Sequence, residues 1–268
     1  MEPVSKMVEY NGARISVVIP AYNEAKNLPF VLLLIPNWVH EVILVNDHSA
    51  DDTAEVARKY LPTVRVINTQ HGRGKGAALQ TGIAAATGDI IVMMDADGSS
   101  DPREMPRFIE ALLAGAYLAK GSRFISCGNS ADITRLRRFG TRVLISIANQ
   151  LFRTRFSDLF CGYNAFWKDC LNFFTVDCEG FEVETQIHLR AYKANLEIVE
   201  VPSYEHSRIY GTGNFLTFRD GWRVLKMILK EWVNGRSVIG TVRMHRSFQQ
   251  EIISWDGLAV SEQIESTQ

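Results

Sequence analysis

The sequence predicts an α/β protein with a mostly parallel central sheet and helices on both of its faces. From residue 14 to about residue 119, short runs of β-branched residues alternate with longer stretches of helical periodicity, which is typical of βαβ units. The runs expected to form strands are almost continuously apolar, as strands are when helices cover both faces of a sheet.

The first half of the chain alternates strands and helices in a regular order. We expect strands at residues 15–20, 41–47, 64–68 and 89–95, and helices at residues 27–34, 51–60 and 75–86. N-capping of the second helix explains Asp51, Asp52 and Thr53, because short polar side chains accept hydrogen bonds from the first backbone N–H groups of a helix. This half has the pattern of a nucleotide-binding fold.

The second half is less regular. Its periodicity predicts helices at residues 134–152, 181–194 and 216–233, and a strand at residues 196–202. Beyond Gly240 the composition becomes polar. We therefore expect one domain over residues 1–240 and a weakly ordered tail over residues 241–268.

Bulk composition narrows the functional class. The formal net charge of -1 argues against a general nucleic-acid binder, which needs a basic excess to neutralise phosphates. The four cysteines form no CxxC pair and are too sparse for a secreted disulfide scaffold, which favours the reducing cytoplasm. No run approaches the ~18 to 20 apolar residues that span a bilayer, and the first residues lack the apolar core of a signal peptide. We expect a cytoplasmic protein that is neither integral to a membrane nor exported.

The segment DADGSSDP, residues 95–102, carries the strongest chemical signal. Asp95 and Asp97 are two positions apart at the end of an apolar strand, and the alternation of side chains in a strand points both carboxylates the same way. Paired carboxylates at the carboxyl edge of an open sheet suit Mg²⁺ or Mn²⁺ that keeps positions open for phosphate oxygens. The alternative is a simple turn, since Asp, Gly and Ser are turn formers.

Other polar segments are expected at the same edge. PAYNE follows the first strand and NDHSADDT the second, and we expect Asp47 to accept hydrogen bonds from a base or a ribose. HGRGKGAALQTG is a glycine-punctuated basic loop that opens a helix, so Arg73 or Lys75 is expected to meet a diphosphate with help from the helix N-terminus. The loop lacks the GxxxxGK[ST] pattern of a P-loop, and a merely solvated loop is the alternative.

In order along the chain stand VVIPAYNE, LVNDHSADDT, GRGKGAAL, GDIIVMMDADGSSDP, SDLFCGYNAF, GFEVET and VPSYEHSRIYGTG. Over residues 14–233 these motifs resemble those of family 2 inverting glycosyltransferases, which have the GT-A fold with a Rossmann-like sheet. The resemblance is strongest to dolichyl-phosphate mannose synthases and bacterial polyprenyl-phosphate glycosyltransferases. It implies a metal-dependent hexosyltransferase.

The resemblance also implies the site residues. The nucleotide-sugar site would comprise Pro20, Ala21, Tyr22, Glu24, Asn46, Asp47, Arg73, Lys75, Gly76, Asp95 and Ala96. Asp95 and Asp97 would hold Mg²⁺ or Mn²⁺, and Arg208 would close over the diphosphate. The chain has Asn46-Asp47 where relatives commonly carry Asp-Asp, which predicts different base recognition. It has Asn164 where mannose synthases often carry arginine, which predicts a different phosphate grip.

The acceptor decides whether a general base is needed. A hydroxyl must lose its proton to a positioned carboxylate, whereas a phosphate monoester with a second pKa of about 6 is already anionic at neutral pH. Glu182 and Glu184 are candidate bases or acceptor-orienting groups, or else acids that stabilise the start of a helix. Arg135 and Arg138, with Tyr210, are candidates for an acceptor phosphate; the alternative for the arginines is a solvated cluster.

The helix at residues 216–233 bears on the acceptor as well. Its apolar stripe comprises Phe218, Trp222, Leu225, Leu229 and Trp232, and its basic stripe comprises Arg219, Arg223, Lys226 and Lys230. Aromatic residues flanked by cations are typical of a helix in the membrane interface, where a lipid phosphate is found. The alternative is an amphipathic helix packed on the domain with a solvated basic edge.

The leading hypothesis is transfer of a hexose from a UDP- or GDP-sugar to a polyprenyl phosphate at the inner face of the membrane. The runner-up is a soluble glycosyltransferase that acts on a hydroxyl of a small molecule or saccharide. A nucleotidylyltransferase is disfavoured because PAYNE stands where a glycine-rich GxGxR-type signature is expected. A non-enzymatic nucleotide-sugar sensor is disfavoured because both metal carboxylates are intact.

Overall fold

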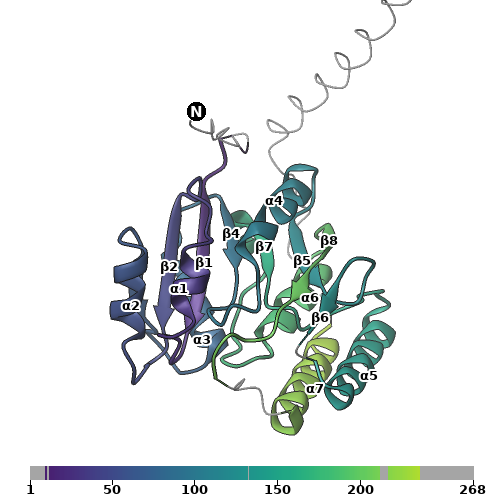
Figure 1. The fold of residues 1–268 in the computed structure, drawn as a ribbon. Helices are drawn as coiled ribbons and strands as arrows, with labels where there is room; N and C mark the ends of the chain where they lie inside the picture. The colour runs from purple at the N-terminus through teal and green to yellow at the C-terminus, as the bar shows by residue number, and fades with distance from the viewer. Residues whose placement is uncertain (1–9, 11, 132, 212–216, 236–268) are drawn as a thin grey trace, which may run out of the picture. The chain divides into compact units, whose positions relative to one another are not determined.

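A seven-stranded sheet with the order β3-β2-β1-β4-β7-β5-β8 forms the centre of the protein (Figure 1). The computed structural model describes residues 10, 12–131, 133–211 and 217–235. Its strands are β1 (Ile15–Ala21), β2 (Glu41–Asn46), β3 (Arg65–Asn68), β4 (Ile90–Met93), β5 (Leu118–Ser122), β6 (Asn129–Ser130), β7 (Asn164–Trp167), β8 (Ile198–Pro202) and β9 (Tyr204–Glu205). Its α-helices are α1 (Leu28–Leu32), α2 (Thr53–Tyr60), α3 (Lys75–Ala85), α4 (Met105–Leu113), α5 (Arg135–Phe152), α6 (Val183–Lys193) and α7 (Thr217–Val233), and its 3-10 helices are Pro102–Glu104 and Lys168–Asn172.

The sheet is mostly parallel, as the sequence predicts. β1 pairs in parallel with β2 and β4, β2 pairs with β3, and β5 pairs with β8. β7 is antiparallel to both of its neighbours, β4 and β5. The carboxyl ends of the parallel strands therefore meet at one edge of the sheet.

Helices cover the sheet because its strands are apolar on both faces. On one face, Val17 and Ile19 of β1 join a core with residues of α1 and α4. On the other face, α3 lies so close that a Cβ on Gly82 would lie 2.4 Å from Val18 Cγ1. This alternation of neighbouring β1 residues between the two faces is the period of two expected of a strand.

A second core holds α5, α6 and α7 together beside the sheet. Ile145 and Ala148 of α5, Leu189 of α6, and Val224 and Ile228 of α7 are buried in it. Figure 1 shows α5 and α7 side by side. Among the described residues, no helix is both long enough and apolar enough to cross a membrane.

Several element predictions need correction. The periodicity missed α4, β5 and β7, and α1 is shorter than the predicted helix at 27–34. Asp52 is the N-cap residue of α2, but its side chain makes no cap hydrogen bond; Asp51 Oδ1 accepts from Thr53 N at 3.2 Å instead. The predicted tail at 241–268 and residue 216 of the last predicted helix lie outside the described residues.

Candidate active site

A cavity of about 500 Å³ lies at the carboxyl edge of the sheet, where β1, β2 and β4 end. Residues from distant parts of the chain meet there because parallel strands bring their ends to one edge. The predicted site residues that line it are Pro20, Ala21, Tyr22, Glu24, Asp47, Arg73, Lys75, Asp95, Ala96, Asp97, Glu184 and Arg208.

Each of the two carboxylates that follow β4 faces a cation. Lys75 Nζ lies 2.6 Å from Asp95 Oδ1, and Arg208 Nη2 lies 3.4 Å from Asp97 Oδ2. Both carboxylates are partly exposed to the cavity, at 27% for Asp95 and 20% for Asp97. The site thus pairs two carboxylates with two cationic side chains at the place expected for a diphosphate.

A turn, not the strand, brings these carboxylates together. The expectation that strand alternation reaches residue 95 is wrong, because β4 ends at Met93 and the chain turns through Gly98, whose φ is +82°. Ser99 N donates to Asp97 Oδ1 at 2.9 Å and holds this turn closed. The extended backbone of the strand thus gives way to a turn, in which Gly98 adopts a left-handed conformation that other residues rarely adopt.

Lys75 links Asp95, at the edge of the sheet, to Glu184 of α6. Its Nζ also lies 2.6 Å from Glu184 Oε1, and the two side chains are almost entirely buried. Burial alone would lower the pKa of Lys75, but Asp95 and Glu184 outweigh burial and hold that pKa above its usual value. Burial raises the pKa of Glu184, and the positive charge of Lys75 opposes that rise.

Glu24 anchors Arg208 rather than facing the cavity as a free carboxylate. Arg208 donates to both oxygens of Glu24, at 3.0 Å and 2.8 Å, and Asn27 Nδ2 donates to Glu24 Oε2 at 2.6 Å. Burial raises the pKa of Glu24, although the hydrogen bonds from Asn27 and Arg208 lower it. Arg208 is therefore held between Glu24 and Asp97.

Asp47 ties the basic glycine-rich loop to the end of β2. Its Oδ2 accepts from Gly74 N at 2.7 Å, and its Oδ1 accepts from Thr69 Oγ1 at 3.0 Å. Because both oxygens accept hydrogen bonds while the residue lines the cavity, Asp47 fixes the shape of the cavity wall at the end of β2.

The glycine-rich loop is not an open anion cradle. Gly76 N and Ala77 N both donate to Glu179 O, at 2.8 Å and 3.2 Å. A Cβ on Gly76 would lie 2.1 Å from Cys178 O, so this glycine makes room for the protein's own backbone. The expected help of the α3 N-terminus in binding a diphosphate is therefore wrong for these two N–H groups.

Gly162 is a cavity residue that the sequence analysis missed. A Cβ at this position would lie 2.4 Å from Asp95 Oδ2 and 2.8 Å from Lys75 Nζ. The chain therefore passes directly over the Lys75–Asp95 ion pair, and a side chain at position 162 would displace the Asp95 carboxylate or the Lys75 ammonium group.

The cavity is also lined by Arg123, Arg137 and Thr141, which the sequence analysis did not select. Arg123 is buried and donates to Asp158 at 2.7 Å and 3.0 Å and to both oxygens of Glu205 at 3.1 Å. Burial alone would lower the pKa of Arg123, but Asp158 and Glu205 hold it above its usual value. The helical period of α5 would have suggested Arg137 and Thr141, since they are four residues apart and share one face.

The remaining predicted residues do not line the cavity: Asn46, Gly76, Glu182, Arg135, Arg138 and Tyr210. Glu182 Oε1 accepts from Arg223 Nη2 of α7 at 2.9 Å, so this carboxylate holds α7 in place. Tyr210 N donates to Asn27 Oδ1 at 2.8 Å, which fastens the segment after Arg208 to α1.

The two positions that depart from the expected motifs make structural hydrogen bonds. Asn46 Oδ1 accepts from Ser49 N at 3.1 Å. Asn164 is fully buried, and its Nδ2 donates to Cys161 O at 2.8 Å. The other amide atom, Asn164 Oδ1, can only accept a hydrogen bond. His188 Nε2 is therefore the donor to it, at 2.8 Å. Asn164 thus serves the core beneath the cavity.

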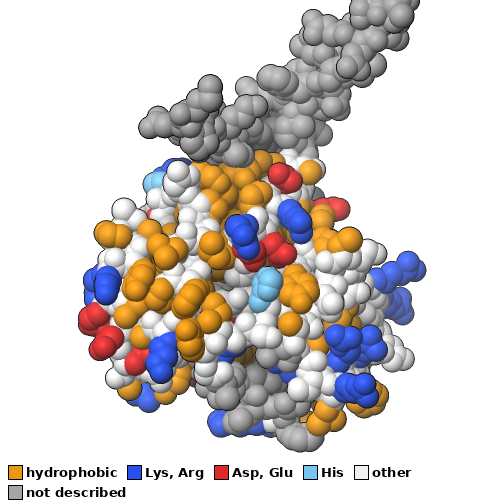
Figure 2. Space-filling view, in the orientation of Figure 1, with side chains coloured by type: hydrophobic (Ala, Val, Ile, Leu, Met, Phe, Trp, Pro, Cys, Tyr) orange, Lys and Arg blue, Asp and Glu red, His pale blue; other side chains and the backbone are white. Residues whose placement is uncertain are grey.

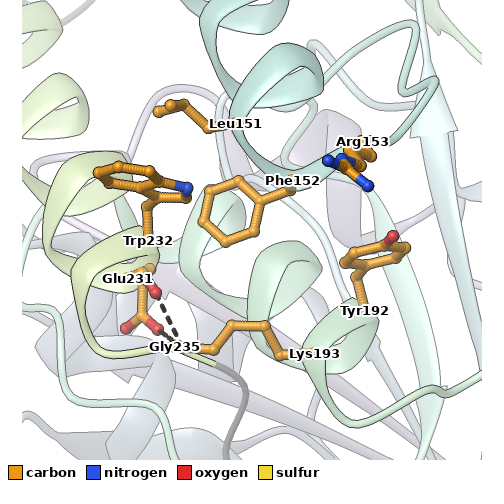
Figure 3. Close-up of a pocket in the computed structure, with 8 residues that line it drawn as sticks. All are labelled: Leu151, Phe152, Arg153, Tyr192, Lys193, Glu231, Trp232 and Gly235. Carbon is orange, nitrogen blue, oxygen red and sulfur yellow. Dashed lines mark hydrogen bonds and ion pairs between the residues drawn. The ribbon is translucent and has the colours of Figure 1, made fainter.

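A smaller cavity of about 360 Å³ lies between the carboxyl ends of α5, α6 and α7 (Figure 3). Phe152, Tyr192 and Trp232 line it. Its charged lining residues are Arg153, Lys193 and Glu231, and Lys193 Nζ lies 2.8 Å from Glu231 Oε2. Its lining has a single carboxylate and none of the residues that follow the strands of the sheet, so the larger cavity is the candidate active site.

The oxygen ligands that Asp95 and Asp97 offer at the larger cavity fit a hard divalent cation. Asp95 and Asp97 supply carboxylate oxygens, which Mg²⁺ and Mn²⁺ prefer, and their other neighbours are cations rather than further ligands. A site with two protein carboxylates leaves most coordination positions for phosphate oxygens and water.

Sequence comparison gives the family of the chain. Residues 16–174 match the model described as glycosyl transferase family 2. The chain is 29% identical to glycosyltransferase AglD of Haloferax volcanii over 71% of its own length and 33% of that protein's, and 29% identical to dolichol-phosphate mannosyltransferase of Pyrococcus furiosus over 80% and 64%. It is 30% identical to polyprenol monophosphomannose synthase of Mycolicibacterium smegmatis over 70% and 76%. The chain thus spans less than two thirds of the first two relatives.

Solved structures share the fold of the chain. Glucosyl-3-phosphoglycerate synthase of Mycobacterium tuberculosis in complex with phosphoglyceric acid superposes with a TM-score of 0.68 and 22% identity, over 92% of this chain and 91% of that one. Its complex with Mn²⁺, UDP-glucose and phosphoglyceric acid gives the same values. At this identity the likeness describes the fold alone.

Proposed function

The chain belongs to glycosyl transferase family 2, and we propose that it moves a hexose from a UDP- or GDP-sugar to a polyprenyl-type lipid phosphate with inversion at the anomeric carbon. The expected GT-A fold is confirmed by the mostly parallel sheet and by the superposition over nearly the whole chain.

One observation carries the proposal: a single cavity is lined both by paired carboxylates and by a guanidinium and a hydroxyl from α5. We assign the part of the cavity at Asp95 and Asp97, its donor end, to the diphosphate of the donor. We assign the part at Arg137 and Thr141, its acceptor end, to the acceptor phosphate, because a guanidinium and a hydroxyl suit phosphate oxygens. The donor sugar would occupy the space between these two groups of residues.

The carboxylates and cations at the donor end support binding of a nucleoside diphosphate there. A divalent cation bound by Asp95 and Asp97 would supply Lewis-acid neutralisation of the diphosphate charge. The sequence motifs leave a UDP-sugar and a GDP-sugar open as donors. The names of two relatives refer to transfer of mannose, so a mannose donor is tested beside a glucose donor. Arg208, anchored by Glu24, lies within reach of the same phosphates.

The acceptor end favours a nucleophile that is already ionised. A phosphate monoester carries a nucleophilic anionic oxygen at neutral pH. That oxygen forms the new bond to the anomeric carbon, the bond from this carbon to the diphosphate oxygen breaks, and the nucleoside diphosphate leaves with the electron pair. Attack from the face opposite the leaving group inverts the anomeric configuration.

Glu184 has a positioning role in this scheme. It is buried and paired with Lys75, so its charge is committed to the lysine that also holds Asp95. A carboxylate held in this way orients the donor side, and a phosphate acceptor requires no proton acceptor from it. The names of the two polyprenyl- and dolichol-phosphate relatives support the same acceptor class.

Peripheral contact with the inner face of a membrane is part of the proposal. The outward residues Trp222 and Leu229 of α7 are exposed, in agreement with the predicted apolar stripe, whereas Leu225 is partly buried.

The proposal is tested by product analysis. The purified protein is incubated with Mn²⁺, labelled UDP-glucose or GDP-mannose, and either short-chain polyprenyl phosphate in detergent or phosphoglyceric acid. We expect label in the organic phase with release of nucleoside diphosphate. Label only in a water-soluble product would favour a small-molecule acceptor, and release of pyrophosphate would overturn glycosyl transfer itself.

A further inference from the structure

One residue that lines the larger cavity, His48, has an unusual backbone conformation. His48 follows Asp47 at the end of β2 and is exposed. Its φ is +58°, in the left-handed region that is uncommon for residues other than glycine. Such a conformation persists where neighbouring contacts hold it, and it occurs preferentially at functional sites. Neither the metal carboxylates nor the acceptor end gives His48 a role.

Hydrogen bonds beside His48 hold its backbone in place. Ser49 N donates to Asn46 Oδ1 at 3.1 Å. Asn23 N donates to Ser49 Oγ at 3.0 Å, and Ala50 N donates to Asn23 Oδ1 at 2.7 Å. The segment that follows β1 and the segment that follows β2 are therefore fastened together around His48.

The side chain of His48, in contrast, is not engaged by the protein. Its imidazole makes no hydrogen bond to another residue in the part of the chain that the structure describes. Asp47 differs, because it accepts from Thr69 Oγ1 and from Gly74 N. A neutral imidazole offers one donor nitrogen, one acceptor nitrogen and a flat ring that can stack on a base. A fixed backbone with an unengaged ring suits a residue that contacts a ligand.

The strand order indicates which part of a nucleotide sugar lies at His48. β1 lies between β2 and β4, so the end of β2 is two strands, or roughly 10 Å, from the end of β4. Figure 1 shows α5, which carries the acceptor end, towards the β5 side of the sheet and away from β2. With the diphosphate at Asp95 and Asp97 and the sugar towards the acceptor end, the ribose lies beside β1 and the base reaches the end of β2.

The surroundings of this end of the cavity suit an uncharged base. Residues 27–39, which begin three residues after Glu24 of the cavity wall, contain no Asp, Glu, Lys or Arg. Figure 2 shows hydrophobic side chains gathered over α1, which lies in this segment. Arg73 also lines the cavity here, because the neighbouring Gly74 N bonds Asp47. Its guanidinium suits a base or a phosphate alike, so Arg73 does not decide between them.

We infer that His48 contacts the nucleobase of the donor and contributes to the choice between donor nucleotides. The inference rests on the proposed function, because it takes the diphosphate to lie at Asp95 and Asp97. Guanine and uracil differ in the carbonyl, N–H and amino groups along their edges. One donor and one acceptor nitrogen held at a fixed place therefore favour one base over the other.

Calorimetry of the full-length protein with Mg²⁺ and UDP, GDP or inorganic pyrophosphate tests the inference. His48→Gly removes the ring and suits the left-handed backbone, and His48→Asn tolerates the same backbone. Both variants should bind the tighter of the two nucleotides about tenfold more weakly, the size of a lost stacking or hydrogen-bond contact, and the other nucleotide less so. Pyrophosphate has no base and should bind all of these proteins alike.

Cys127→Gly is the matched control. Cys127 is exposed, has a φ of +69° and does not line the cavity, so this substitution makes the same backbone change at a distance from the site. We expect its nucleotide affinity to equal that of the unmodified protein. Both glycine variants should keep or raise the melting temperature, because glycine adopts a left-handed backbone without strain. Circular dichroism checks this expectation.

The outcomes separate the role of His48 from the proposed function. Unchanged nucleotide affinity in both His48 variants would overturn the inference and leave the proposed function standing. An equal loss for UDP and GDP, or an equal loss for pyrophosphate, would do the same, because neither is a choice between bases. An unmodified protein that binds neither nucleotide would overturn the proposed function and the inference with it.

Discussion

Lys75 at the first position of α3 and Glu184 in the first turn of α6 form a buried ion pair, with Nζ 2.6 Å from Oε1. The same Nζ lies 2.6 Å from Asp95 Oδ1. One lysine therefore pairs with two carboxylates from separate parts of the chain, and the candidate active site is also part of what stabilises the fold.

Replacing Lys75 by Met should destabilise the protein by about 3–5 kcal/mol, because the buried carboxylate of Glu184 and the partly exposed carboxylate of Asp95 lose their shared counter-charge. Adding Glu184→Gln to that variant should recover part of the loss. Urea unfolding measures both. Lys59→Met on the exposed face of α2 is the matched control. A loss at Lys75 of no more than about 1 kcal/mol, the size of a typical surface effect, would contradict the coupling.

Asp97→Ala should abolish transfer while the fold is retained, because one of the two candidate metal carboxylates is lost. We expect the rate of nucleoside diphosphate release to fall about 100-fold or more. Asp52→Ala, which removes an exposed carboxylate without a cap hydrogen bond, should leave the rate unchanged. A folded and active Asp97→Ala protein would argue against the metal assignment.

Gly162→Ala should lower both activity and Mn²⁺ affinity, because the added Cβ would lie 2.4 Å from Asp95 Oδ2. Gly140→Ala on α5 meets no atom within 4 Å and should stabilise the protein by about 0.5–1 kcal/mol through helix propensity. Calorimetric Mn²⁺ titration and thermal melting distinguish the two variants. Unchanged Mn²⁺ affinity in Gly162→Ala would show that the Lys75–Asp95 pair tolerates a side chain there.

Arg137→Ala should raise the KM for a phosphate acceptor by tenfold to about 100-fold, the effect of losing a hydrogen bond to a charged group. Arg135→Ala, on the exposed face of the same helix, should change the KM little with the short-chain acceptor in detergent. Initial rates at varied acceptor concentration measure both. The reverse order of effects would place the acceptor on the outer face of α5.

His188 should make the protein less stable in acid. Burial, with a smaller effect of Lys120, lowers the pKa of His188 well below its usual value, so the native state stays neutral. The unfolded chain takes up a proton near pH 6.5, so this contribution to stability is present above that pH and falls by about 1.4 kcal/mol for each pH unit below it.

His188→Gln keeps a donor for Asn164 and removes the titrating ring, so its unfolding free energy should depend less on pH between 6.5 and 5.5. Urea unfolding at these two pH values gives the comparison. An identical pH dependence in both proteins would mean that other groups account for the acid sensitivity.

The sequence predicted correctly that the polar residues after the strands meet at one edge of the sheet, and the reason is physical. Apolar strands that end in polar residues must bring those residues to one edge, so Asp47, Asp95 and Asp97 line the same cavity. The order of apolar strands and polar strand ends is enough to predict this meeting, because the strands and helix of a βαβ unit follow one another along the chain.

Features that depend on distant partners were not predictable in this way. β5 escaped detection because it contains Lys120, whose buried charge is matched by Glu200 of β8 at 2.5 Å. Gly76 suggested an anion site, but the backbone of Glu179 takes its N–H group. Arg123 depends on Asp158 in the same manner. In each case the deciding contact lies far along the chain.

The central claim is that Asp95 and Asp97 hold a divalent cation that carries the diphosphate of a nucleotide sugar. Crystals soaked with Mn²⁺ and UDP-glucose or GDP-mannose, measured at the manganese edge, test it directly. The account predicts an anomalous peak between Asp95 and Asp97 with the diphosphate beside it. A nucleotide bound elsewhere, with no peak at these two carboxylates, would contradict it.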